Sequence, residues 1–452
     1  MASDAAVTAG AVVRILFLAF AVAVTLTAPP FPGRRSCLLL LTGIAAYCVV
    51  FFALMYAAGG AETCRENLRD TGKVLYIPLV ALMLIAARRA YGARLPDWSI
   101  AGAGALYAFL IFLAVLSGTS AYSYRTGFGY KGWFYAANEV SCILAIACPV
   151  TICLCLERRN TLRRWPCAAA AALALISVAF CASYLGTKIV FAFLFLYALL
   201  AFFWCLIRAI RRRSGAAGAV IAGALAVLML ALFLTSPLNA YLGKVYLARM
   251  GLSSEEIAEA WGRAPTDAAD GIEVGVNETA AAAAEASEGT WLRAQIAEKP
   301  LMQKLDKILS RRLLNAAPAV EAYRNGPLLR KLFGVGYANA PCYDRRIDFM
   351  IELDGLSLLI RHGIVGFALF FLPYVLVIVR LLIGFFRRPG AVLSSLRAST
   401  LLYSALAAFA ISFLAGHVLT APAVGIFMLA VTAGALEPPD VPDDFERNDK
   451  KA

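Results

Sequence analysis

Long apolar blocks constrain this chain more than any other feature of its sequence. Runs of about twenty apolar residues recur along most of its 452 residues, and each run has the length that a helix needs to cross a bilayer. In lipid, every backbone amide must be bonded within its own segment, so such runs form helices. The sequence therefore predicts an all-α, polytopic transmembrane protein with about eleven spans. The expected spans are 11–28, 37–58, 74–88, 98–117, 135–156, 166–184, 187–208, 215–236, 355–382, 397–416 and 419–436.

The composition supports a membrane protein and argues against several other classes. Hydrophobic residues make up 61% and charged residues 16% of the chain, whereas a soluble domain is about half apolar and about a quarter charged. The net charge of +13 lies mostly in arginine clusters between the apolar blocks, which argues against a nucleic-acid partner. The sequence contains no phosphate-binding loop, nucleotide fingerprint or metal-ligand spacing, so we expect no ATP-driven chemistry, no cofactor and no metal.

The arginine-rich loops predict how the chain is oriented and divided. They alternate with arginine-poor loops, and short cationic loops stay in the cytoplasm, so the N-terminus is expected outside. Residues 1–236 would hold the first eight spans and 237–353 one large extracytoplasmic loop. Residues 354–436 would hold the remaining spans, and 437–452 would form an acidic cytoplasmic tail.

The large outer loop changes the sign of its charge halfway along. Residues 253–300 have ten acidic and three basic side chains and contain an alanine-rich run, which predicts a flexible arm. Residues 301–340 are basic, and their apolar residues recur at spacings of three and four. This pattern predicts helices that lie along the membrane surface.

Polar side chains stand at the outer ends of several predicted spans, where ionisable groups usually face a protein interior or a wet cavity. These side chains are Lys131, Asn138, Glu139, Lys188, Glu352 and Asp354. Each also has a structural explanation, because a lysine can extend to the interface and a carboxylate can complement a helix dipole. His362 and His417 stand alone and far apart in the sequence, which favours structural roles over metal binding.

Four segments, in order, are similar to motifs of one known protein family. "YKGWFYAANEVSCILAIACPV" is similar to the family's entry into a span after an outer loop, and "YLGTKIVFAFL" to its short outer corner. "ILSRRLLNAAP…LLRKLFGVGYANAP" resembles its Ser-Gly-Arg pattern and its Phe-Gly-x-Gly-Tyr turn. "DFMIELDGLSLLIRHGIVGFALFFLPY" resembles its re-entry segment, an acidic pair followed by Gly-Ile-x-Gly. Together the four segments resemble the O-antigen ligase and polymerase relatives of Gram-positive bacteria.

The resemblance implies a metal-independent membrane glycosyltransferase at a bacterial plasma membrane. It would move a saccharide from an undecaprenyl-diphosphate carrier to a hydroxyl of a glycan or lipid acceptor outside the cell. A diphosphate leaving group needs fixed cations, and an acceptor hydroxyl needs a general base. On this basis we expect Lys188 and Arg312 to clamp the diphosphate and Glu352 to accept the proton. The expected substrate-binding residues are Lys131, Asn138, Glu139, Arg311 and Asp354.

The sequence departs from the family pattern at two places. Arg311 replaces the glycine of Ser-Gly-Arg, and Glu352 stands where lipopolysaccharide ligases typically have a histidine. The second change favours polymerisation or attachment of a cell-wall or capsular glycan over the ligase reaction.

Two other functions compete with glycosyl transfer. A transporter, such as a flippase for the same lipid-linked saccharide, would place polar groups near the bilayer midplane and often shows repeats. Here the polar groups stand at the outer span ends, which favours an enzyme. A non-catalytic scaffold of a cell-envelope complex is the third alternative. The sugar, its linkage and the acceptor stay open.

Overall fold

The chain folds almost entirely into helices, which form two compact units. The computed structural model describes residues 4–124, 128–157, 165–212, 215–240, 242, 291–309, 312–337 and 351–437. Unit 1 comprises Met1–Arg94, Gly275–Ile378 and Phe409–Leu429, and unit 2 comprises Leu95–Val274, Val379–Ala408 and Ala430–Ala452. The predicted all-α, polytopic membrane fold is confirmed.

The described residues contain 7 helices that are long and apolar enough to cross a membrane. The number rises to 8 if α15 (Asp354–Phe370) and α16 (Leu372–Arg387), which are bent by 47° against each other, form one span. Shorter apolar helices lie within α1 (Asp4–Thr27) and at α19 (Pro422–Ala435). The expected number of about eleven was larger because it included these two and because it divided α2 (Arg34–Tyr91) into two spans.

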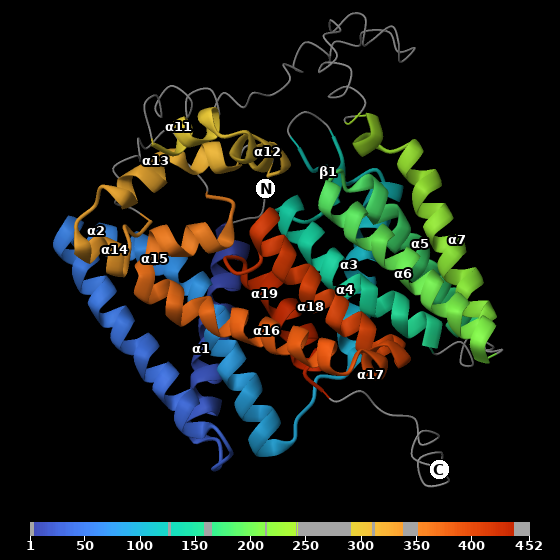
Figure 1. Cartoon of the computed structure of the whole chain (residues 1–452), viewed down its shortest axis with the longest axis horizontal. Helices are drawn as coiled ribbons and strands as arrows, with labels where there is room; N and C mark the ends of the chain where they lie inside the picture. Colours follow the sequence, from blue (N-terminus) through green and yellow to red (C-terminus); the bar gives the residue numbers. More distant parts are fainter. Residues whose placement is uncertain are drawn as a thin grey trace, which may run out of the picture. The chain divides into compact units, whose positions relative to one another are not determined.

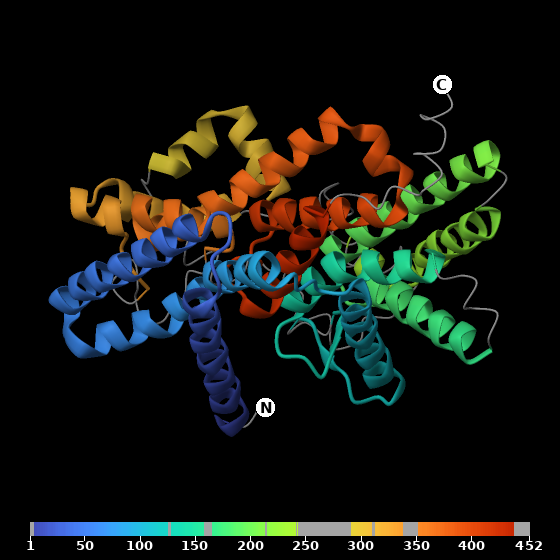
Figure 2. The same cartoon turned by 90° about the horizontal axis from the view of Figure 1, so that it is seen from below.

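A glycine pair interrupts α2. Gly59 and Gly60 leave the helical conformation, and Gly60 has a φ of 72°. Figure 2 shows the two arms of α2 running back on each other from this break. The polar stretch "ETCRENLRDTGK", which lies between the expected spans 37–58 and 74–88, belongs to the second arm and is helical. Its Asn67 is fully buried and donates from Nδ2 to the Thr63 carbonyl at 2.8 Å, so this polar arm contributes to the interior of unit 1.

The predicted basic segment 301–340 forms three helices of unit 1. These are α12 (Pro300–Ile308), α13 (Arg312–Arg324) and α14 (Leu328–Phe333), and α11 (Trp291–Glu298) precedes them. Helix α14 packs against α15, which in turn packs against α2. That these helices lie along a membrane surface stays a prediction.

Several sequence predictions fall outside the described residues. The acidic arm was expected over 253–300, and its last part forms α11, whereas 253–290 is not described. The same holds for Arg311 and for residues 438–452 of the expected tail.

Helix α4 (Ala137–Glu157) forms the centre of unit 2. Its apolar window is 83% buried, and α3, α5, α6 and α7 pack around it (Figure 1). These four helices span Asp97–Leu116, Trp165–Tyr184, Lys188–Arg212 and Ala216–Leu234. Small residues allow the close approach, because Gly104 of α3 lies directly against Ala147 of α4. The helix that begins with Asn138 and Glu139 is therefore surrounded by protein.

A small hairpin connects α3 to α4. Its strands β1 (Ala121–Tyr122) and β2 (Tyr130–Gly132) pair antiparallel. Ser123 donates from Oγ to the Leu185 carbonyl at 2.7 Å, and Gly129 approaches the same backbone so closely that a Cβ would overlap it. The hairpin thus packs on the short corner before α6.

Candidate functional site

A guanidinium and a carboxylate from distant parts of the sequence meet in unit 1. Arg312, the first residue of α13, forms an ion pair through Nε with Oε2 of Glu352, which lies just before α15. Nη1 of Arg312 also donates to the Leu414 carbonyl at 2.5 Å, at the end of α18 (Leu396–Leu414). The two side chains are 17% and 34% exposed, so solvent or a ligand can reach both. The fold thus brings together two of the three residues expected to be catalytic.

Asp354 lies close by in sequence but has a different environment. It is only 1% exposed, and its carboxylate accepts hydrogen bonds from three backbone amides and one hydroxyl. The donors are His417 N (3.0 Å), Val418 N (2.8 Å), Leu419 N (2.8 Å) and Thr420 Oγ1 (2.9 Å). Asp354 therefore holds the loop between α18 and α19. Its oxygens are buried and already bonded to protein donors, and that Asp354 binds substrate stays a prediction.

The Phe-Gly-x-Gly-Tyr turn packs against a break in α15. The backbone amides of Val335 and Gly336 each donate to a carbonyl of α15 at 3.0 Å. At Gly363 the helix leaves its regular conformation, with a φ of 69°. A Cβ at this position would overlap the backbone of Leu332, so only glycine lets the turn and the helix approach this closely.

His362 connects this turn to α2. The residue is fully buried, with Nδ1 at 3.1 Å from the Tyr47 hydroxyl and Nε2 at 3.1 Å from the Tyr337 hydroxyl. The Tyr47 hydroxyl also lies 3.0 Å from the backbone carbonyl oxygen of His362 and 3.4 Å from that of Phe333. Both ring nitrogens are occupied by protein groups, which agrees with the structural role expected from the sequence.

Two further contacts fix Tyr337. Its backbone amide donates to Oδ1 of Asn67 at 2.5 Å, and the guanidinium of Arg361 lies 4.5 Å from the centre of its ring. The sequence drew attention to the glycine turn but missed Tyr47, Asn67 and Arg361 as its supports. The bond between Asn67 and Tyr337 joins residues 270 apart, which no local pattern indicates.

The other predicted site residues belong to unit 2. Lys131 lies in β2, and its Nζ donates to the Tyr135 carbonyl at 2.9 Å. Asn138 and Glu139 lie in the first turn of α4 and are half-buried. Lys188 is the first residue of α6. These residues are therefore not in the same compact unit as the Arg312–Glu352 pair.

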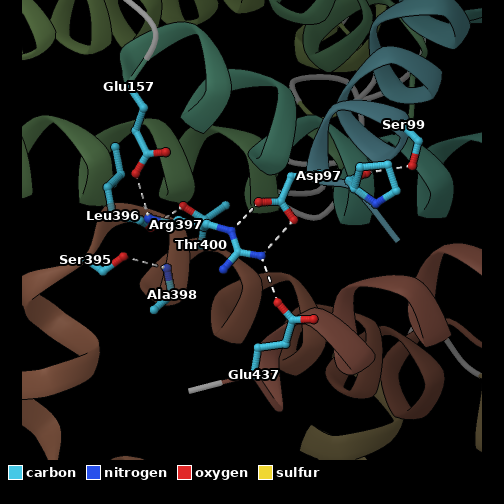
Figure 3. A network of polar contacts seen from close by, with 10 residues as sticks. Asp97, Ser99, Glu157, Ser395, Leu396, Arg397, Ala398, Thr400 and Glu437 are labelled. Carbon is cyan, nitrogen blue, oxygen red and sulfur yellow. Dashed lines mark hydrogen bonds and ion pairs between the residues drawn. The ribbon is translucent and has the colours of Figure 1, made fainter. Parts of the chain in front are cut away.

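A second cluster of charges lies within unit 2 (Figure 3). Arg397 of α18 pairs with Asp97 through two nitrogens, and its Nη2 also lies 3.1 Å from Oε2 of Glu437. Its backbone amide donates to Glu157 Oε1 at 3.1 Å. The cluster therefore joins the start of α3, the end of α4, the start of α18 and the residues after α19. No pattern in the sequence indicated this cluster.

Within the part of the chain that the structure describes, no three His, Cys, Asp or Glu side chains are grouped so that they could hold a metal ion. Searches of curated proteins and of solved structures gave no match to this chain. A family model described as O-antigen ligase like membrane protein matches residues 1–437. The match covers nearly the whole chain and includes the Arg312–Glu352 pair, the glycine turn and the loop held by Asp354. This chain therefore belongs to the O-antigen ligase-like family of membrane proteins.

Proposed function

We propose that this protein transfers a saccharide from an undecaprenyl-diphosphate carrier to a hydroxyl of a glycan or lipid acceptor, on the outer face of a bacterial plasma membrane. Its family supports a role in glycan ligation or polymerisation at a membrane. The observation that carries the finer proposal is the contact between Arg312 and Glu352, which pairs a phosphate-binding group with a proton acceptor.

Each member of the pair has a defined role in the proposed reaction. The acceptor oxygen attacks the anomeric carbon of the donor sugar, and the bond from that carbon to the diphosphate breaks. The carrier leaves as the diphosphate, and Glu352 takes the proton of the acceptor hydroxyl. Arg312 has five N–H donors, of which Glu352 and Leu414 use one each. The remaining donors can bind phosphate oxygens, and arginine suits this because its charge is permanent and its geometry is bidentate.

The site residues of unit 2 remain sequence predictions within this proposal. Lys188 would supply a second cation for the diphosphate, and Lys131, Asn138 and Glu139 would contact the saccharide. In the proposed reaction the charge on the leaving group is balanced by arginine and lysine, so no metal ion is required.

The clamp can be tested with purified protein in detergent, a synthetic polyprenyl-diphosphate saccharide, an acceptor glycan and a chelator. Arg312→Ala should reduce the transfer rate by about a hundredfold, the usual effect of losing one charge-stabilising donor. The transfer rate of Arg312→Lys should lie between those of Arg312→Ala and the wild type, because lysine keeps the charge but lacks the bidentate geometry of a guanidinium. The matched control is Arg324→Ala, at the other end of α13, where the guanidinium lies over the Trp291 ring. This variant should transfer at the wild-type rate.

Three results would contradict parts of the proposal. Wild-type activity of Arg312→Ala would show that Arg312 does not bind the diphosphate during transfer. Wild-type activity of Lys188→Ala would show the same for Lys188. If the wild type formed no glycosidic bond but moved the lipid-linked saccharide between leaflets of a vesicle, the protein would be a transporter.

A further inference from the structure

His417 has a backbone conformation that its residue type disfavours. Its φ is 61°, and it is the single non-glycine residue with positive φ in the part of the chain that the structure describes. The preceding residue, Gly416, has a φ of 67°, which glycine adopts without a steric cost. A second glycine at position 417 would remove the remaining strain. The chain instead keeps an imidazole there, and strained residues of this kind gather at functional sites.

The side chain of His417 adds a second unfavourable feature. Its Nε2 atom is buried, and no described residue forms a hydrogen bond with it. Buried polar atoms in native proteins nearly always have a partner, and an exception commonly marks a group that serves a ligand. His362 offers a contrast within unit 1, because both of its ring nitrogens are bonded to tyrosine hydroxyls. Strain and an unpartnered nitrogen therefore coincide in one residue.

The loop that carries His417 is attached to the Arg312–Glu352 pair. Arg312 donates to the carbonyl of Leu414, which lies three residues before His417. Gly416 packs so tightly on the backbone carbonyl of Glu352 that a Cβ would not fit between them. The backbone amide of His417 is itself held by Asp354 at 3.0 Å. Contacts on both flanks thus hold the backbone of this residue against the segments that carry Arg312 and Glu352.

We propose that His417 is a further substrate-binding residue, whose Nε2–H donates a hydrogen bond to a diphosphate oxygen of the polyprenyl carrier. The inference rests on the proposed function, because it takes the ligand of Arg312 to be that diphosphate. Diphosphate oxygens accept hydrogen bonds and do not donate them, so an imidazole N–H on a loop that the Arg312 guanidinium also contacts is a suitable second donor. The strained backbone is retained because a glycine would relax the loop and lose this donor.

Three substitutions separate a binding role from a structural one. His417→Gly fits the backbone best and has no side chain, and His417→Asn also tolerates positive φ but is too short to replace Nε2. His417→Gln carries an amide nitrogen at about the reach of Nε2, although its backbone is less suited to this conformation. If the role of His417 is structural, affinity for the polyprenyl diphosphate should follow the stability of each variant, and the glycine and asparagine variants should bind most tightly. If His417 binds the diphosphate, the order of affinities should be reversed, with the affinity of the glutamine variant nearest that of the wild type.

The measurement is binding of a sugar-free polyprenyl diphosphate to the purified full-length protein, together with its thermal unfolding in the same detergent. We expect His417→Gly and His417→Asn to unfold at or above the wild-type temperature. They should bind the diphosphate about 10- to 100-fold more weakly, as for loss of a hydrogen bond to a charged group. His417→Gln should recover part of that affinity. Wild-type affinity in the glycine and asparagine variants, or affinity that falls only where the unfolding temperature falls, would overturn the proposal.

The same experiment distinguishes this inference from the proposed function. If the wild type does not bind the polyprenyl diphosphate, the proposed function fails and the role of His417 fails with it. If the wild type and Arg312→Ala differ in affinity but the His417 variants match the wild type, only the inference about His417 is wrong.

Discussion

Single polar side chains of unit 1 fall into two groups according to their partners. Both ring nitrogens of His362 and both carboxylate oxygens of Asp354 are bonded to other groups of the protein. Arg312 and Glu352 instead remain partly exposed and bonded to each other. The sequence could place Glu352 and Asp354 together at the start of a span, but it could not separate their roles. The partners of Asp354 begin 63 residues away, and only the folded chain brings them to it.

Substitution of the two carboxylates should therefore change the stability of the protein by different amounts. Asp354→Asn should lower the free energy of unfolding by about 2–3 kcal/mol, because an amide nitrogen would then face backbone N–H groups. Glu352→Gln should change it by no more than about 1 kcal/mol, the upper range for a partly exposed ion pair. Thermal unfolding of both variants in one detergent provides the comparison. Equal stability of Asp354→Asn and the wild type would show that Asp354 does not hold the loop.

At the scale of elements, breaks in helices position the site more than the helices themselves do. The sequence predicted one span over 355–382, whereas the structure breaks it at Gly363 and bends it again between α15 and α16. Likewise, the glycine pair in α2 sends a polar arm back into unit 1, where a loop had been expected. Apolar periodicity predicts where helices lie, but it contains no information about partners far away in the sequence. The Gly-Ile-x-Gly pattern was visible, yet its packing against the glycine turn required the structure.

The break in α15 leads to a stability prediction with an internal control. Gly363→Ala should destabilise the protein by about 1–3 kcal/mol, because alanine at positive φ is strained and its Cβ would displace the turn. Gly384→Ala in α16 is the matched variant, since no atom lies within 4 Å of an added Cβ there. It should be neutral or slightly stabilising, as expected for alanine in a helix. Denaturation of both variants under identical conditions tests this, and an unchanged Gly363→Ala would contradict the description of the break.

For the whole molecule, the sequence predicted the class of protein well and the polar contacts poorly. Every expected apolar block corresponds to a helix in the described residues, because the bilayer imposes length and hydrogen bonding on each segment separately. Arg397 shows the limit of this reasoning, because no pattern in the sequence indicated that it joins α18 to α3, to α4 and to the residues after α19. Arg312 and Glu352 were singled out individually by their resemblance to a family pattern. Their ion pair could not be predicted from their separation of 40 residues.

The predicted orientation can be tested on intact cells. Single cysteines introduced at positions within 253–300, in a variant that lacks the native cysteines, should react with a membrane-impermeant maleimide added from outside. The expectation follows from the arginine-rich loops on the opposite side of the membrane. Cysteines placed in 437–452 are the control and should react only after the membrane is permeabilised. Labelling of the tail but not of the arm would reverse the orientation.

The central claim is that Glu352 accepts the proton while saccharide moves from a polyprenyl diphosphate to an acceptor. The most direct measurement is the rate of glycosidic bond formation by purified wild type and Glu352→Gln, with a defined lipid-linked donor and a chelator present. The amide keeps the size of the side chain and cannot take the proton, so the rate should fall by about a hundredfold or more. Affinity for the sugar-free polyprenyl diphosphate should not weaken, because Arg312 is retained. A Glu352→Gln variant that transfers at the wild-type rate would contradict this account of the site.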